Sequence, residues 1–176
     1  SSVIKIPAQL FSQRKNLSLP FPASGRKQVE KKAKGDMTIY NAYSSDPQPL
    51  VVNTRFETPD GKIFRLTESI KVAGAKIVDG KIVPSTTSAI VVADKPGPEY
   101  NIGPVERFTI PGLKGSPKYN AFYGQSAAAM TGGFIGELTY PTPDDVKKAK
   151  DEIAQQLEDS LRVLIAAQIP EDFKVL

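Results

Sequence analysis

The stretch of sequence that decides the fold runs from residue 90 to residue 137 and reads IVVADKPGPEYNIGPVERFTIPGLKGSPKYNAFYGQSAAAMTGGFIGE. It continues an apolar run at 89–93 that predicts a buried strand, and a second strand is predicted at 107–110. Proline and glycine are dense between and after these strands. Glycine permits positive φ and proline fixes φ, so this density specifies a path of turns rather than a reaction. We therefore expect a structural role for this stretch.

Composition excludes much of enzyme chemistry. The chain has 176 residues, enough for one domain or two small ones, and its 15 prolines and 13 glycines favour many turns and hence a β-rich fold. It contains no cysteine and no histidine. The chain therefore lacks disulfides, thiolate nucleophiles, the usual general base at neutral pH and the commonest zinc ligand. We expect no catalysis, no cofactor and no metal, and only carboxylates, Lys, Ser/Thr or Tyr remain for any enzyme hypothesis.

The net charge of +4 is unevenly distributed. Residues 1–35 hold eight Lys or Arg against one acid, Glu30. Such a basic arm suits an anionic partner, but no aromatic residue interrupts the cluster at 26–34, which argues against nucleic acid. We expect the polar segment 13–35 to be an extended arm lying on a neighbouring subunit or domain. The candidate subunit contacts in it are Arg26, Lys27, Lys31 and Lys32.

No run of 18 apolar residues is present, so no membrane-spanning segment is expected. A secretory signal peptide is not expected either, and a membrane anchor in a longer precursor stays open. The first twelve residues alternate around several aliphatic side chains and predict an edge strand interrupted by Pro7.

Short strands separated by turns follow from Gly35 onward. Strands are expected at 36–41, over the run 50–56, and at 70–72. Asp60-Gly61 lies between two apolar runs and predicts a hairpin flanked by Phe56 and Phe64, with the loop length deciding whether the two rings share a face. Asp79-Gly80, between two Lys-Ile-Val tripeptides, predicts a second, shorter hairpin. This spacing of turns indicates short antiparallel strands in a sandwich or curled sheet.

The C-terminal region predicts a helix over about 143–167. Thr142 is a good N-cap, Pro143 suits the first helical position, and acids follow in the first turn. Apolar residues then recur three or four apart, which is typical of one helical face. Opposite charges spaced four apart predict ion pairs Lys147–Asp151, Lys148–Glu152 and Glu158–Arg162. The apolar face consists of Val146, Ala149, Ile153, Leu157, Leu161 and Leu164, and of these Leu157 and Leu161 are candidate subunit contacts.

Three further groups of residues are candidate sites. Asp94 and Glu99 flank a Pro-Gly-Pro turn and are candidates for a cation or acid/base site, although loop acids are usually only solvated and no EF-hand spacing is present. The segment 112–116 lacks the spacing of a phosphate-binding loop and is better interpreted as a turn. The glycine-rich half also holds several aromatic residues, which we expect in the core or at an interface, with ligand binding as the alternative. These are Tyr100, Tyr119, Phe122, Tyr123 and Phe134, the first four being candidate subunit contacts.

The order of these features resembles the baseplate J-like family of phage tail and contractile-injection proteins. The shared features are Val91-Val92-Ala93, the Pro-Gly turn with Tyr100-Asn101-Ile102, Ile110-Pro111-Gly112, and Thr131-Gly132-Gly133 ahead of Glu137. An upstream hairpin at 53–65 also fits, with Asn53 where glycine is usual. The segment 35–41 is similar to a strand of membrane-anchored bacterial envelope proteins with this domain. The resemblance covers roughly 50–137 and implies subunit packing without catalysis.

Together these observations predict a mostly β, α+β protein with an extended N-terminal arm and one C-terminal amphipathic helix. The expected domains are an arm at 1–34, a baseplate J-like β domain at 35–140, and a helix with its tail at 141–176. The expected function is a non-catalytic structural subunit of a symmetric extracytoplasmic or baseplate-like assembly, located at a cell surface or in a virion-like particle. Its partners would be copies of itself and other subunits. The alternative is a monomeric cell-surface adhesion module, and a carboxylate-dependent hydrolase ranks third.

Overall fold

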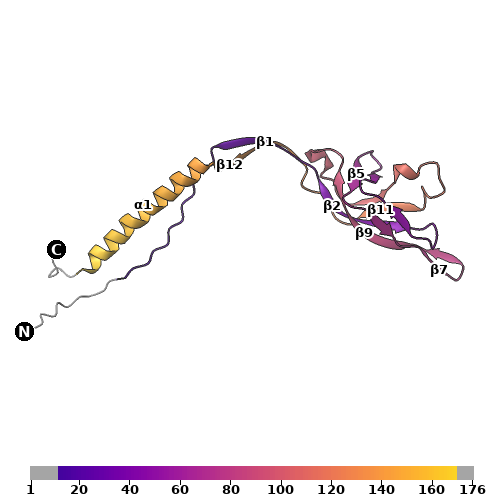
Figure 1. The fold of residues 1–176 in the computed structure, drawn as a ribbon, viewed down its shortest axis with the longest axis horizontal. Helices are drawn as coiled ribbons and strands as arrows, with labels where there is room; N and C mark the ends of the chain where they lie inside the picture. Colours follow the sequence, from indigo (N-terminus) through magenta and orange to yellow (C-terminus); the bar gives the residue numbers. More distant parts are fainter. Residues whose placement is uncertain (1–11, 170–176) are drawn as a thin grey trace, which may run out of the picture. The chain divides into compact units, whose positions relative to one another are not determined.

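A computed structural model of the chain describes residues 12–169. The chain divides into two compact units, one formed by Gln28–Glu137 and the other by the residues before and after that segment. Strands dominate the first unit, whereas the second contains the helix α1 (Figure 1). The first eleven residues, where an edge strand was expected, lie outside the described residues.

The larger unit is built on a six-stranded sheet with every neighbouring pair antiparallel. The two edges of this sheet also meet. Thr109 lies just beyond the strand at one edge, Glu57 ends the strand at the other edge, and the two residues exchange two backbone hydrogen bonds of 2.9 Å. The sheet therefore curls into a nearly closed barrel, which is the second of the two forms, a sandwich or a curled sheet, that the sequence predicts. Its strands, in spatial order, are β10 (Val105–Phe108), β11 (Phe122–Ser126), β2 (Lys34–Asn41), β9 (Ser85–Ala93), β5 (Ile63–Leu66) and β4 (Arg55–Glu57).

Two small sheets accompany the barrel. Strand β3 (Gln48–Leu50) pairs with β6 (Ile70–Val72), and β7 (Lys76–Val78) pairs with β8 (Lys81–Val83). Asp79 and Gly80 between β7 and β8 both have positive φ, at 51° and 72°, as a tight hairpin turn requires. The hairpin predicted from this Asp-Gly pair is therefore confirmed.

The barrel core comes from alternate residues of the strands. In β2, Met37 and Ile39 are buried while their neighbours are partly exposed, which is the period-two pattern of a sheet with one covered face. Phe56 of β4 lies directly opposite Phe64 of β5, and neither side chain is exposed to solvent. The hairpin at Asp60-Gly61 is thus confirmed, and its two phenylalanines share the core face.

The run 50–56, expected as one strand, is divided in two. Strand β3 ends at Leu50 and β4 begins at Arg55. Between them Asn53 has a φ of 67°, and the Thr54 N–H donates to the Val51 carbonyl (3.1 Å). A left-handed residue in a closed turn cannot continue a ladder, so the apolar Val51 and Val52 become exposed turn residues.

The basic segment 13–35, expected as an extended arm, contains a paired strand. Its residues Gly25–Lys31 form β1, which pairs with β12 (Phe134–Tyr140) in a two-stranded ribbon. Most side chains of β1 are exposed. A ribbon exposed on both faces shows no alternation of apolar and polar residues, and the sequence therefore carried no strand pattern at this position.

Helix α1 (Pro143–Gln168) matches the predicted helix to within one residue at its C-terminal end. Thr142 Oγ1 accepts from the Asp145 N–H (3.1 Å), and the Asp145 carboxylate accepts from the Thr142 N–H (2.9 Å), which is a capping box. Two predicted ion pairs, at Lys147 and Arg162, form, whereas Glu152 accepts from Gln156 (3.2 Å) instead of pairing with Lys148. No helix within residues 12–169 is long and apolar enough to cross a membrane.

Candidate functional site

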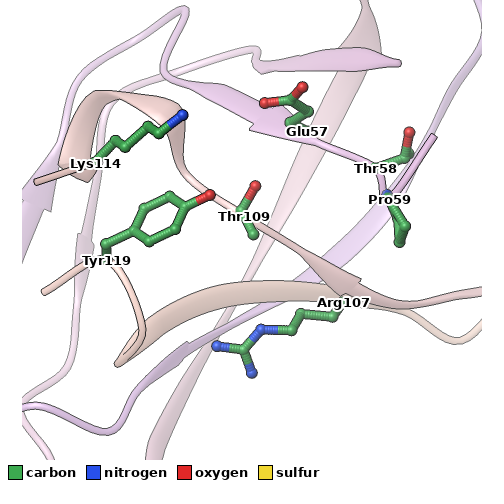
Figure 2. A pocket seen from close by; sticks show the side chains of 7 residues that line it. All are labelled: Glu57, Thr58, Pro59, Arg107, Thr109, Lys114 and Tyr119. Atoms are coloured by element: carbon green, nitrogen blue, oxygen red, sulfur yellow. The ribbon is translucent and has the colours of Figure 1, made fainter. Parts of the chain in front are cut away.

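One cavity of the larger unit lies where the barrel closes, and we call it the closure cavity. Its volume is about 380 Å³. Figure 2 shows the side chains around it, which come from β4 with the following turn, from β10 and Thr109 just beyond it, and from the loop after β10. The lining residues are Glu57, Thr58, Pro59, Arg107, Thr109, Lys114 and Tyr119.

Local turns place the loop residues of this cavity. Ile110 leads into a short 3-10 helix, η2 (Pro111–Leu113), and the Lys114 N–H donates to the Pro111 carbonyl (3.1 Å). Gly115 then reverses the chain with a φ of 84°, a conformation that favours glycine. In the next turn, the Tyr119 N–H donates to the Ser116 carbonyl (3.2 Å). The turn predicted at 112–116 is therefore confirmed, and it carries Lys114 into the cavity lining.

Two elements of the cavity wall are held by side-chain contacts. The Arg107 guanidinium donates to the Asn120 carbonyl (2.8 Å) and lies 4.2 Å from the centre of the Tyr123 ring. Thr58 Oγ1 donates to the Asp60 carboxylate (2.6 Å), and it accepts from the Lys62 N–H (2.8 Å). The hydrogen bond from the Lys62 ammonium, followed by that from Thr58, lowers the pKa of Asp60. The rim of the cavity beside Thr58 is thus a turn held by side-chain hydrogen bonds.

Asp94 and Glu99 have separate environments. The Asp94 carboxylate accepts a hydrogen bond from Arg65 Nε (2.5 Å), and this bond is the main cause of a lowered pKa for Asp94. Glu99 is exposed within the short 3-10 helix η1 (Pro98–Tyr100). In the described part of the chain, no three acidic side chains are grouped as a metal site would need.

The aromatic candidates fall into different surroundings. Phe122 is buried in the barrel core, and Tyr100 packs edge-on against Phe64, with ring centroids 5.8 Å apart. Tyr123 stacks on Tyr40, with centroids 4.8 Å apart. Tyr119 lines the closure cavity and Phe134 is half-buried in β12.

The basic candidates Arg26, Lys27 and Lys31 lie in β1, and Lys32 follows directly after it. All four side chains are exposed. The Lys27 ammonium lies 5.5 Å from the centre of the Tyr140 ring, a cation–π contact across the β1–β12 ribbon.

In the smaller unit, the arm meets the start of α1. The Ser24 N–H and hydroxyl both donate to the Asp145 carboxylate, at 2.8–2.9 Å. Phe21 and Pro22 line a cavity of about 180 Å³ together with Ala149 and neighbouring helix residues. At this point the partner of the arm is the C-terminal helix of the same chain.

The apolar face of α1 is largely uncovered. Ala149 is its one buried residue within the described structure. Leu157 and Leu161 are half-buried, and Leu164 is 37% exposed. The two leucine candidates therefore lie on one helical face, as the sequence predicts, and this face is accessible.

The junction between the arm and α1 should respond to acid. Hydrogen bonds from the Ser24 N–H, the Thr142 N–H and the Ser24 hydroxyl hold the pKa of Asp145 well below its ordinary value of 3.8. Because the folded-state pKa is lowered, the stabilisation is present above about 3.8 and is lost as the pH falls through the folded-state pKa. We expect the Ser24 amide resonance to stay constant from neutral pH to about 4 and to move only in stronger acid.

Asp145→Asn should displace this resonance already at neutral pH and abolish its acid titration. Asp144→Asn, in the same helical turn, is the matched control and should leave the Ser24 resonance in place. If Asp145→Asn leaves the Ser24 amide resonance unchanged, the Ser24–Asp145 contact does not form in solution.

The closure cavity itself was missed by reasoning from sequence. Its charged residues, Glu57, Arg107 and Lys114, are separated by up to 57 positions and follow no motif. Of the candidate residues named above, only Tyr119 belongs to it. The 112–116 segment was interpreted as a turn, and nothing in its spacing indicates that Lys114 faces a glutamate from another hairpin.

Comparison with protein families matches residues 32–128 to the GlxA beta barrel domain, a segment of more than half the chain. The resemblance to the baseplate J-like family is therefore wrong. It rested on turn glycines, prolines and apolar positions, which any small barrel needs at its corners and in its core. The phage-tail and cell-envelope interpretations lose their support with it. No curated protein matches the chain.

Proposed function

This chain belongs to the GlxA β-barrel domain family, and we propose that it is a non-catalytic structural module that associates with copies of itself, and with other subunits, through the apolar face of α1. An extracytoplasmic location, expected from the sequence, stays a prediction. The absence of histidine and cysteine favours a structural role over an enzymatic one, because the commonest general base and thiolate nucleophile are missing.

The observation that carries the proposal is the exposure of that face. A helix of 26 residues packed on little else is only marginally stable in water, because most helical stability comes from covering an apolar face. The arm contacts the first turns of α1, around Asp145 and Ala149. The face from Ile153 to Leu164 is left half-buried or exposed and gains most by packing on a second helix of the same kind.

Charge substitution on this face tests the proposal. Leu157→Lys should convert the assembled chain to monomers, because an unpaired ammonium in a helix–helix contact costs several kcal/mol. The barrel core is built by the other unit, so its melting temperature should hardly change. Light scattering after size exclusion gives the mass, and near-ultraviolet circular dichroism follows barrel melting.

Gln155→Lys is the matched control, because position 155 lies on the opposite side of α1 from Leu157 and is exposed. It should leave the mass of the assembly unchanged. A wild-type chain that is monomeric at every concentration tested would contradict the proposal. So would equal masses for the two lysine variants.

A second function, ligand binding by a surface module, is favoured by the closure cavity. The cavity is open and polar, and it presents charged side chains of both signs. This function is compatible with self-association, because the cavity residues all belong to the larger unit and the apolar face of α1 to the smaller one.

A further inference from the structure

The closure cavity contains polar groups without partners in the protein. Within residues 12–169, the Glu57 carboxylate and the Lys114 ammonium form no hydrogen bond or ion pair, with each other or with a neighbour. The Thr109 and Tyr119 side-chain hydroxyls likewise have no partner in the described chain. A carboxylate, an ammonium and two hydroxyls therefore border one space of about 380 Å³ and have no partner within the described chain, so they are available to a ligand.

The arrangement is held on a firm backbone. Glu57 and Thr109 exchange both of their backbone hydrogen bonds at 2.9 Å, which locks the floor of the cavity at the closure of the barrel. Figure 2 shows the Tyr119 hydroxyl pointing toward Thr109, with the Lys114 and Glu57 side chains extending on the same side of it. A fixed backbone under the site lowers the ordering cost of binding a ligand, while the exposed Lys114 side chain still has to be ordered on binding.

The signs of the charges restrict the ligand. Glu57 repels an anion that fills the cavity, and Lys114 with Arg107 repels a simple cation. A molecule that carries both a carboxylate and an ammonium satisfies both poles. The volume lies within the range of about 300–1,000 Å³ that is usual for small-molecule sites.

We propose that the closure cavity binds a free α-amino acid as a zwitterion, its ammonium group on Glu57 and its carboxylate on Lys114. The Thr109 and Tyr119 hydroxyls add hydrogen bonds to the ligand carboxylate or ammonium. Pro59 and the Tyr119 ring offer apolar surface to the ligand side chain. The site does not depend on self-association through α1, since every residue that forms it lies in the barrel unit.

The first test compares ligands that differ in one charge. The full ¹⁵N-labelled chain is titrated with L-leucine, L-serine and L-glutamate, followed by amide chemical shifts. We expect saturable shifts at residues 57, 109, 114 and 119 for at least one of them. The amide of that amino acid, which lacks the carboxylate, and its N-acetyl derivative, which lacks the ammonium, should each bind at least about tenfold more weakly.

The second test removes each pole of the site. Glu57→Gln and Lys114→Met should each weaken binding about tenfold or more while the amide spectrum outside the cavity is preserved. Glu106→Gln and Lys95→Met change the same charges at exposed positions outside the cavity lining, and they should bind as the wild type does.

The proposal is overturned if no amino acid in the panel gives saturable shifts at these positions. It is also overturned if the one-charge derivatives bind as tightly as the parent amino acid, or if Lys114→Met binds like the wild type. None of these outcomes bears on the mass of the assembly, so the ligand site and the self-association are tested separately.

Discussion

Replacing Phe64 by alanine is expected to lower the free energy of unfolding of the barrel by about 3–5 kcal/mol. Phe64 has no solvent exposure, and its ring packs edge-on against those of Tyr100 and Phe108, with centroids 5.8 and 6.0 Å apart. It also lies opposite Phe56 across the β4–β5 ladder. Truncation removes the buried apolar surface and leaves a cavity bordered by aromatic rings. Urea unfolding followed by tyrosine fluorescence measures the loss.

Phe21→Ala is the matched control for this substitution. It makes the same chemical change in the arm, where the Phe21 ring is 45% exposed, so less apolar surface returns to water. Its cost to the barrel unit should stay below about 0.5 kcal/mol. If both variants unfold at the same urea concentration, the aromatic cluster does not organise the barrel core.

Gly133→Ala is expected to destabilise the barrel unit by about 3 kcal/mol, at the upper end of the cost of overpacking. A Cβ atom at this position would lie 2.1 Å from the Gly97 carbonyl oxygen and 3.0 Å from Asn101 Oδ1. Asn101 now holds Gly133 on both sides, accepting from its N–H (2.7 Å) and donating to its carbonyl (2.8 Å). The backbones must separate, and these hydrogen bonds are lost with them.

Gly103→Ala provides the comparison within the same segment of sequence. No atom lies within 4 Å of a Cβ built on Gly103, and its φ is not in the left-handed range. Its effect should remain within about 0.5 kcal/mol. Denaturant midpoints of the two alanine variants decide the matter, and equal midpoints would show that the approach of Gly133 to Gly97 is not tight in solution.

The local features of the fold could be predicted because their causes lie within a few residues. The glycine of an Asp-Gly pair adopts positive φ readily, as Gly61 and Gly80 do, so both hairpins follow from the dipeptides themselves. Thr142 and Pro143 start a helix through hydrogen bonds and dihedral angles that belong to the first turn. The short antiparallel strands, in a sandwich or a curled sheet, then follow from the regular spacing of turns.

Among the sequence-based predictions that failed, one concerns a strand and one the family. The strand depends on a partner that lies far away in the chain. Strand β1 exists because it pairs with β12, more than a hundred residues later, and its own pattern of exposed charges gives no period. The family resemblance failed for a related reason. Turn and core positions are shared by barrels in general, so these residues resembled a family to which the chain does not belong.

The sequence by itself determined the β-rich class, the two Asp-Gly hairpins, the capped C-terminal helix and the lack of imidazole and thiol chemistry in a chain without histidine or cysteine. Only the tertiary structure decided where the barrel closes, which glycines lie close to a neighbouring backbone and which polar groups share a cavity. Glu57 and Lys114 come together because the Glu57–Thr109 backbone pairing joins the two ends of the sheet. That contact is a property of the closed barrel, and no local preference of either segment encodes it.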